Sequence, residues 1–152
     1  MRATPVRLVV DTREQQPWAF DPTLVVVERR ALPAGDYSIA GFETRVAVER
    51  KSLEDLVSTV IRSRQRFHRE LALLQEYEAA CVVVEANLAD VVQGRFRSGA
   101  SPASVFGAVV AIVIDTGVPV YFCSDRQIAC RFAQDFLLRF HRTRSEARHE
   151  TP

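Results

Sequence analysis

The sequence contains little lysine, glycine or cysteine, and each shortage restricts what the chain can be. Lysine occurs once, at Lys51, and apart from three histidines every other basic side chain is an arginine. Arginine is a planar group that stays charged, whereas lysine is a compact ammonium group that loses its proton more readily on burial. A single lysine two residues after Glu49 therefore predicts a site that needs lysine chemistry and not only positive charge; the alternative is chance.

The cysteines and the apolar segments exclude several classes of protein. Cys81, Cys123 and Cys130 are odd in number, lie among apolar residues and lack the spacing of zinc ligands, so we expect reduced core residues. No apolar run approaches the length of a membrane span, and the N-terminus has no apolar stretch typical of signal peptides. We therefore expect a cytoplasmic protein without membrane contact.

Length and composition are those of an ordinary globular domain. The chain has 152 residues, of which 47% are hydrophobic and 26% charged, and this is enough to bury a substantial core. It shows no internal repeat, low-complexity segment or linker. We expect a single domain over residues 1–152, with its core over about 6–140 and a basic, fraying tail over about 141–152.

Positive charge is concentrated in two segments, although the net charge of +1 does not by itself predict a nucleic-acid partner. Residues 62–69 contain four arginines and His68 but no acidic residue. Such a strip either neutralises phosphates or forms the solvated face of a helix. For the second basic segment, residues 139–148, the solvated face is the favoured interpretation.

Apolar periodicity predicts alternating strands and helices. The expected strands cover residues 6–11, 24–28, 37–40, 44–50, 80–85 and 118–123. The expected helices begin after the cap residue Ser52 and cover about 64–77, 102–117 and 125–140. The third and fourth strands, broken by Gly41, should form an antiparallel hairpin. This order predicts an α/β fold with a mixed central β-sheet flanked by helices.

Acidic residues fall at the ends of the predicted strands, at Asp11, Asp36 and Glu85, and within the return strand of the hairpin at Glu49. Because side chains alternate along a strand, Glu49 and Lys51 should share one face, while the preceding valines and the intervening arginine take the other. Asp36, at the mouth of the hairpin, is close enough to join them. The sequence therefore predicts a cluster of carboxylates beside the lysine.

The chemistry of this cluster indicates a metal. Carboxylates brought close together repel one another unless a cation offsets their charge. Oxygen ligands without histidine or cysteine suit Mg²⁺ or Mn²⁺, which bind phosphate oxygens and lower the pKa of bound water. A lysine at the edge of the cluster can orient or deprotonate the attacking water, or neutralise the transition state. The spacing alone is a weak indicator, because carboxylates and lysines are common.

Three longer segments surround these residues: Asp11-Thr12-Arg13-Glu14 with Pro17-Trp18, then Gly35-Asp36-Tyr37, and Glu49-Arg50-Lys51-Ser52 followed by Asp55-Leu56. Together they resemble the XPF-type nuclease family, which belongs to the restriction-endonuclease-like PD-(D/E)XK superfamily. The resemblance covers about residues 6–140. It implies a restriction-endonuclease-like nuclease fold and an Mg²⁺- or Mn²⁺-dependent endonuclease that acts on DNA, here in a stand-alone form.

The resemblance also implies roles for individual residues. Asp11, Asp36 and Glu49 correspond to metal ligands, Lys51 corresponds to the catalytic lysine, and the Arg50 carbonyl is a further candidate ligand. The Arg50 side chain, on the opposite face, is expected to bond an acidic side chain structurally.

Several neighbouring residues have more than one interpretation. Glu14 either supports the metal site or a second metal, or forms a salt bridge within its loop. Asp55 is expected to cap its helix or to pair with an arginine such as Arg50, and not to bind metal. Glu85 is expected to be a structural charge at a strand end. Trp18 and Tyr37 are expected to pack in the core.

DNA contacts and partners follow from the same resemblance. Arg13, Arg64 and Arg66 are candidate phosphate contacts. Family members usually append paired helix-hairpin-helix modules or a helicase, and no Gly-rich hairpin element follows the nuclease segment here. We therefore expect a separate partner to supply DNA recognition. Pairing through the later helices, residues 101–117 and 125–140, predicts a homodimer.

The sequence thus predicts an enzyme that hydrolyses phosphodiester bonds of DNA to 5′-phosphate and 3′-hydroxyl ends. The alternative is a non-catalytic DNA-binding or scaffold subunit that pairs with an active nuclease. Which DNA structure is cut (flap, fork or other branched DNA), whether one or two metal ions act, and whether the pathway is repair, recombination or other DNA processing are left open by the sequence.

Overall fold

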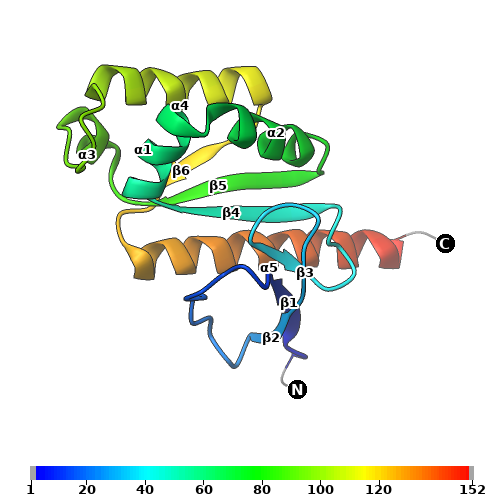
Figure 1. Ribbon diagram of the computed structural model, residues 1–152. Helices are drawn as coiled ribbons and strands as arrows, with labels where there is room; N and C mark the ends of the chain where they lie inside the picture. The colour runs from blue at the N-terminus through cyan, green and yellow to red at the C-terminus, as the bar shows by residue number, and fades with distance from the viewer. Residues whose placement is uncertain (1–2, 151–152) are drawn as a thin grey trace.

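The computed structural model describes residues 3–150, with side chains described up to residue 148, and shows a six-stranded sheet between two layers of helices (Figure 1). The strands are β1 (Val6–Val10), β2 (Val25–Arg29), β3 (Tyr37–Ile39), β4 (Val46–Ser52), β5 (Ala79–Glu85) and β6 (Val120–Phe122). The helices are α1 (Leu53–Arg62), α2 (Arg64–Gln75), α3 (Leu88–Val92), α4 (Pro102–Thr116) and α5 (Arg126–Glu150).

The sheet is mixed, in the order β2-β1-β3-β4-β5-β6. β3 runs antiparallel to both of its neighbours, β1 and β4, whereas the other three pairings are parallel. β1, β4 and β5 therefore point the same way, and their carboxyl ends meet at one edge of the sheet. This topology brings Asp11, Asp36 and Glu85 to the same edge as the end of β4, as the sequence predicted.

Apolar side chains fill both faces of the sheet, which explains why its central strands are nearly continuous in valine and alanine. On one face Val46 and Val48 of β4 pack toward α5 together with Leu8 and Tyr37. On the other face Ala47 packs with residues of α1, α2 and α4, including Phe67. Figure 1 shows the same division, with α5 on one side of β4 and β5 and α1, α2 and α4 on the opposite side.

The predicted helix starts agree with the structure. The Ser52 side chain accepts a hydrogen bond from the Asp55 amide and caps α1, and the Ser101 side chain caps α4 through the Ser104 amide. Ser63 separates α1 from α2 and has non-helical φ and ψ of −120° and 32°. This break turns the chain, so that α2 covers the sheet beside α1.

Two segments differ from the prediction. α3 was not predicted; it is a five-residue helix with a capping box formed by Asn87 and Asp90. The last helix also ends later than predicted, because the sequence predicts an end at about residue 140 and α5 continues to Glu150. The fraying expected after about residue 141 stays a prediction. Arg144 in this extension pairs with Glu78 of the α2–β5 connection at 2.9 Å. Residues 151–152 of the predicted tail lie outside the described residues.

The cysteines are free thiols, of which Cys81 and Cys123 are buried core residues as expected. Cys130 is only half-buried and contacts the Ala19 carbonyl at 3.5 Å. None of the described helices combines the length and the apolar character needed to cross a membrane.

Candidate active site

Alternation along β4 sends consecutive residues to opposite faces of the sheet. Glu49 and Lys51 point toward α1 and α2, where they line a cavity of about 240 Å³ together with Thr59 and Phe67. The Arg50 side chain lies on the other face, with its guanidinium 4.8 Å from the centre of the Trp18 ring. The prediction that Glu49 and Lys51 share one face is confirmed.

Asp36 reaches the same site from the turn that precedes β3. The Gly35 backbone passes so close to β4 that a Cβ atom at this position would lie 2.9 Å from the Ala47 Cβ. The φ of Gly35, 75°, also favours glycine. Asp36 Oδ2 accepts a hydrogen bond of 2.8 Å from the Arg50 amide, which fixes its carboxylate against β4. Asp36 and Glu49 together line a cavity of about 320 Å³ next to the hairpin.

Asp11, at the end of β1, is buried and fully hydrogen-bonded. Its Oδ1 accepts from the Leu32 amide at 2.8 Å, and its Oδ2 accepts from Arg13 Nε at 2.6 Å and from the Arg13 amide. Burial opposes ionisation of this carboxyl, but these hydrogen bonds outweigh it and hold its pKa below the ordinary value. Asp11 is therefore an ionised carboxylate whose compensating cation is Arg13.

Asp36 and Glu49 have no comparable compensation. Burial raises the pKa of Asp36 to about 6; the charge of Glu14 adds to the rise, while the Arg50 amide opposes it. Burial and then repulsion by Asp36 raise the pKa of Glu49 well above its ordinary range, although Lys51 counteracts this. Two half-buried carboxylates thus repel each other in a cleft that opens to solvent, which is the arrangement that a bound cation relieves.

The donor set fits a hard divalent cation in charge and in atom type, because it consists of carboxylate oxygens. No three histidine, cysteine, aspartate or glutamate side chains among residues 3–148 stand close enough together to hold a metal as they are oriented. The reason lies partly in Asp11, whose oxygens face Arg13 and Leu32. The assignments of Asp11, Asp36, Glu49 and the Arg50 carbonyl as ligands stay predictions.

Lys51 is held at the edge of this cluster by three elements of the fold. Its Nζ lies 3.8 Å from Glu49 Oε1 on its own strand and 3.4 Å from Thr59 Oγ1 on α1. The Phe67 ring of α2 lies beneath it, with 5.0 Å between Nζ and the ring centre. Only 16% of the Lys51 side chain is exposed, so the ammonium group is confined next to Glu49.

On the opposite face, Arg50 is the centre of a saturated network. Its guanidinium donates to Glu14 at 3.1 Å, to Glu85 and to the Gln16 carbonyl at 2.7 Å. Trp18 Nε1 donates to Glu85 at 2.9 Å, and the Tyr37 hydroxyl donates to Glu14 at 2.6 Å. The network ties β3, β4 and β5 to the loop after β1, which carries Arg13.

These contacts distinguish between the interpretations that the sequence left open. Glu14 forms a salt bridge with Arg50, and Glu85 at the end of β5 pairs with the same guanidinium. A supporting role of Glu14 in the metal site stays a prediction. Arg50 pairs with these two acids and not with Asp55, which is exposed in the first turn of α1. Trp18 is 3% exposed and stacks on Tyr37 with ring centres 4.6 Å apart, so both are packing residues as predicted.

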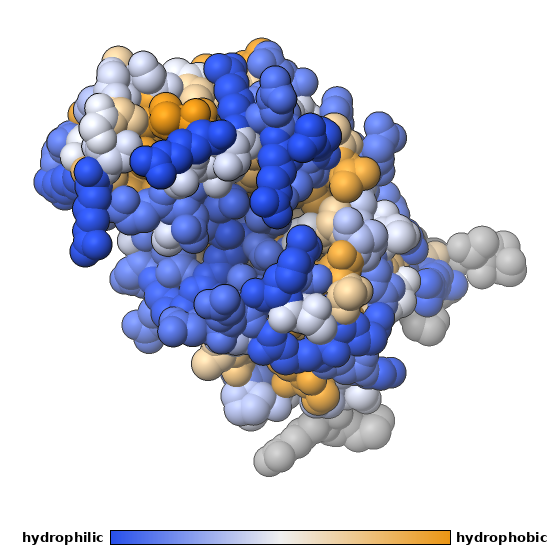
Figure 2. Space-filling model, viewed as in Figure 1, coloured by the Kyte–Doolittle hydropathy of each residue, from blue (hydrophilic) through white to orange (hydrophobic). Residues whose placement is uncertain are grey.

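The candidate phosphate contacts lie around the cleft. Arg64 and Arg66 are exposed in the first turn of α2, and Arg66 lines the cavity that contains Lys51. Arg13 is 67% exposed although its Nε contacts Asp11. In the view of Figure 2, hydrophilic residues cover most of the face that the molecule presents.

Three further residues of the cleft were not assigned to it from the sequence. Thr59 and Phe67 contact Lys51, and Glu70 lines both cavities that flank Glu49 and lies 3.7 Å from Arg66. Phe67 and Glu70 are three residues apart on α2 and so share one face of the helix. That spacing was the available signal, but it also fits a helix that only packs on the core.

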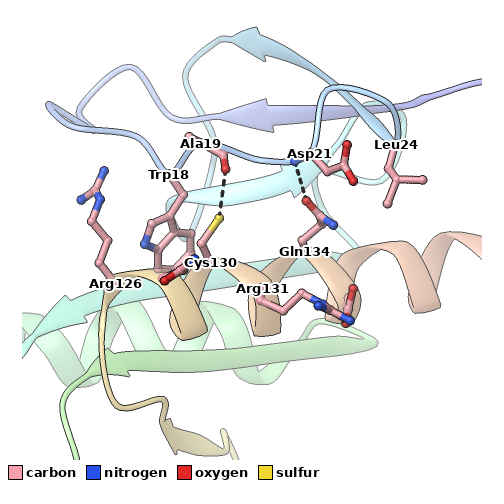
Figure 3. Close-up of a pocket in the computed structure, with 10 residues that line it drawn as sticks. Trp18, Ala19, Asp21, Leu24, Arg126, Cys130, Arg131 and Gln134 are labelled. Atoms are coloured by element: carbon pink, nitrogen blue, oxygen red, sulfur yellow. Dashed lines mark hydrogen bonds and ion pairs between the residues drawn. The ribbon is translucent and has the colours of Figure 1, made fainter.

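A larger cavity, of about 610 Å³, lies elsewhere. It lies between the segment 18–24 and α5, on the face of the sheet opposite to Lys51 (Figure 3). The Asp21 amide donates to Gln134 at 2.8 Å and the Cys130 thiol contacts the Ala19 carbonyl, which fastens this segment to the helix. It contains none of the residues of the carboxylate cluster.

Comparison with known proteins agrees with this geometry. The chain is 25% identical to XPF from Aeropyrum pernix, with a TM-score of 0.66, over 86% of this chain and 59% of that one. A second structure of the Aeropyrum pernix XPF, in complex with DNA, has a TM-score of 0.68 at 24% identity and covers 91% of this chain and 66% of that one.

A sequence relative is a Methanocaldococcus jannaschii protein named as an ATP-dependent RNA helicase. It is 28% identical over 123 residues, which are 81% of this chain but 14% of the relative, so the chain spans a small part of that protein. The sequence pattern of the ERCC4 domain matches residues 10–136. With this match over most of its length and the restriction-endonuclease-like sheet of the XPF structures, the chain belongs to the ERCC4 domain family of XPF-type nuclease domains.

Proposed function

We propose that this chain is a metal-dependent endonuclease that hydrolyses phosphodiester bonds in DNA. The observation that carries the proposal is the pair of half-buried carboxylates, Asp36 and Glu49, whose pKa values are raised in an open cleft beside the one lysine of the chain. Buried groups of like charge destabilise a fold, so they are expected where a function needs them. A scaffold without activity would have no use for this arrangement.

Asp36 and Glu49 would hold the metal, Mg²⁺ or Mn²⁺, together with Asp11 and the Arg50 carbonyl. When bound, such an ion stabilises negative charge at phosphorus and lowers the pKa of water. The Asp36 carboxylate already lies against the Arg50 peptide, through the hydrogen bond from that amide. Rotation of Arg13 away from Asp11 would free a carboxylate oxygen of the third acid.

The other side chains bind the substrate and handle the proton. Lys51 Nζ, 3.8 Å from Glu49, would orient or deprotonate the attacking water, or neutralise the charge that develops on the phosphate. Arg64 and Arg66, exposed on α2, and Arg13 would hold the phosphates on either side of the scissile bond. In-line attack by water then gives 5′-phosphate and 3′-hydroxyl ends.

The comparisons support DNA as the substrate, because the Aeropyrum pernix XPF was solved in complex with DNA. The relative named as a helicase carries a similar segment within a much longer protein. This is compatible with a separate helicase or DNA-recognition partner for the present chain. Structure-specific cleavage of flaps or forks, in repair or recombination, would depend on such a partner.

We further propose a homodimer through α4 and α5. The two helices cover opposite faces of the sheet but both flank β6, which is an edge strand. Around this edge α4 exposes Val110 and Ile114, the latter by 76%, and α5 exposes Ile128. An Ile114→Asp variant should be monomeric in light scattering, while Val26→Asp on β2, at the other edge, should leave the dimer intact.

The test of the activity uses linear, flap, fork and single-stranded DNA, each with Mg²⁺, with Mn²⁺ and with chelator. We expect cleavage by the wild type that needs metal and is lost in Lys51→Ala. Arg45→Ala is the matched control, since it also removes a positive charge but lies in an exposed pair with Glu78. DNA binding without cleavage of any substrate would favour the alternative, a non-catalytic subunit that pairs with an active nuclease.

A further inference from the structure

We infer that Phe67 and Thr59 are positioning residues for Lys51, which hold its ammonium group beside Glu49 without carrying charge themselves. The inference rests on the proposed function, because it assigns these two residues to the lysine of the same site. It goes beyond the residue roles that the family resemblance implies, which assign no task to Thr59 or Phe67, and extends the site to α1 and α2.

The Lys51 side chain needs contacts of this kind to fix the direction of its ammonium group. Its ammonium group sits on a flexible four-carbon chain, so its direction is decided by what surrounds it. Glu49 Oε1 alone, at 3.8 Å, does not define that direction, since the distance is longer than a good hydrogen bond. Among the described side chains, Glu49 is the one carboxylate within 4.0 Å of Nζ.

The Phe67 ring supplies the first constraint. Its centre lies 5.0 Å from Nζ, within the range in which the negative face of an aromatic ring attracts a cation. The attraction is larger when water is excluded, and Lys51 is 16% and Phe67 2% exposed. The ring cannot move away, because it is buried in the same core cluster as Leu56 and Leu71.

Thr59 supplies the second constraint. Its hydroxyl lies 3.4 Å from Nζ and comes from α1, whereas the ring comes from α2. A threonine side chain in a helix is restricted to two χ1 rotamers, so its hydroxyl has few positions once α1 is packed. The break at Ser63 folds α2 back beside α1, which brings the two contacts to the same ammonium group.

The two partners are neutral, and this matters for the reaction. A second carboxylate next to Lys51 would add negative charge to a cleft in which Asp36 and Glu49 already repel each other. A ring and a hydroxyl orient the ammonium group while its full charge remains available to the phosphate. If the Phe67 ring only filled the core, lowering the electron density of its face would leave catalysis unchanged.

The test therefore changes electron density and not shape. Phe67 is replaced by phenylalanine with one, three or five ring fluorines, which progressively weakens attraction of a cation while the ring stays apolar and nearly as large. With metal and DNA saturating, we expect kcat to fall stepwise, by about twofold to thirtyfold for the fully fluorinated ring, with unchanged KM and DNA affinity. Phe42 is the matched control, because it is also buried and lies 5.0 Å from the Arg45 guanidinium, on the other face of the sheet.

The hydroxyl is tested by Thr59→Val, which keeps the branched shape, and Thr59→Ser, which keeps the hydroxyl. The valine variant should lower kcat and the serine variant should restore most of it. Thr143→Val removes a hydroxyl that bonds the Phe140 carbonyl on α5, and it should leave kcat unchanged.

A second measurement separates the inference from the proposed function. In a double-mutant cycle of unfolding, Phe67→Leu and Lys51→Met should be less destabilising together than the sum of the single changes, whether or not the protein cleaves DNA. If the wild type cleaves and Lys51→Ala does not, but the fluorinated rings have full kcat, the inference is wrong and the endonuclease stands. If the wild type cleaves nothing, the endonuclease proposal fails, and the cycle still decides whether Phe67 holds Lys51.

Discussion

The two faces of β4 are buried to the same degree but differ in how their charges are paired. On the α5 side, the side chains of Arg50, Glu14 and Glu85 are 14%, 16% and 14% exposed. On the α1–α2 side, those of Lys51 and Glu49 are 16% and 12% exposed. The Arg50 network satisfies its members with short hydrogen bonds, whereas Glu49 and Asp36 repel each other with Lys51 at a longer distance.

This difference assigns separate tasks to adjacent residues. Buried ionised groups are tolerated when paired and hydrogen-bonded, and they then fix the arrangement of the elements that supply them. A buried acidic pair left without compensation destabilises the fold and is retained for chemistry. Arg50 therefore organises the site from behind, and the reaction proposed above is assigned to Glu49 and Lys51.

The largest effect on folding should come from breaking the Arg50 network. Arg50→Met keeps much of the apolar stem but leaves Glu14 and Glu85 as buried acids without their cation. Removing one partner of a buried ion pair typically lowers the free energy of unfolding by about 3–5 kcal/mol. Urea unfolding should show a loss of that size.

The matched control for this change is Arg45→Met, at the residue directly before β4. Arg45 pairs with Glu78, but the two side chains are 37% and 39% exposed, and exposed pairs contribute only about 0–1 kcal/mol. If Arg45→Met were as destabilising as Arg50→Met, the distinction between a saturated network and ordinary surface pairs would be lost.

Glu49→Gln changes the neighbouring residue, whose side chain lies on the other face of β4. It should lower activity strongly without lowering stability, the opposite of Arg50→Met. Cleavage should fall by about a hundredfold to a thousandfold, which is the typical effect of removing one electrostatic group from an active site. Stability at neutral pH should rise, because the substitution removes the repulsion between Glu49 and Asp36. Steady-state cleavage and urea unfolding of one preparation check both; a stability loss would mean that Glu49 is a structural acid like Glu85.

The fold was predictable where its determinants are local. The strands other than β3 contain runs of valine or other apolar residues, and Ser52 and Ser101 marked the helix starts correctly. α3 was missed because five residues held by a capping box show no apolar periodicity. The last turns of α5 were missed because they depend on long-range contacts, such as Arg144 with Glu78 and Arg148 over the Phe42 ring.

The site, like the fold, was predictable where it depends on local sequence and not where it depends on long-range contacts. Strand alternation and strand ends were enough to bring Asp36, Glu49 and Lys51 together, since these are properties of β4 and its hairpin. The partners of Arg50 depend on the register that sets Ser52 opposite Glu85 and on the path of the loop after β1, which no local pattern shows. The contact of Lys51 with Phe67 likewise depends on the turn at Ser63.

The dependence of stability on pH tests the second half of the comparison, the uncompensated pair of Asp36 and Glu49. Asp36 has a folded-state pKa of about 6 against an ordinary value of 3.8, so between these values the unfolded chain is ionised there and the folded chain is protonated. Stability contributed by Asp36 is therefore greatest below about pH 4 and is lost as the pH rises through about 6, by on the order of 2–3 kcal/mol.

The measurement is the difference in unfolding free energy between wild type and Asp36→Asn from about pH 4 to about pH 7.5. The difference isolates Asp36 from groups with lowered pKa values, such as Glu78 at about 2, whose contribution has the opposite sign. Mg²⁺ should raise the melting temperature of the wild type at the upper end of this range, and chelator should reverse it. A variant as pH-dependent as the wild type would show that Asp36 is not the strained carboxylate.

The smallest expected effect concerns Trp18, which belongs to the saturated side. Trp18→Phe keeps an aromatic ring on Tyr37 and beneath Arg50 but removes the 2.9 Å hydrogen bond from Nε1 to Glu85. Glu85 retains Arg50, so no charge is orphaned, and the loss in unfolding free energy should be about 1 kcal/mol. Because the ring faces away from Lys51, kcat should stay within about twofold of the wild type, a change of under 0.5 kcal/mol in the barrier. A fall in kcat much larger than this, with stability almost intact, would mean that the network does more than hold the strands and that the division between the two faces of β4 is incomplete.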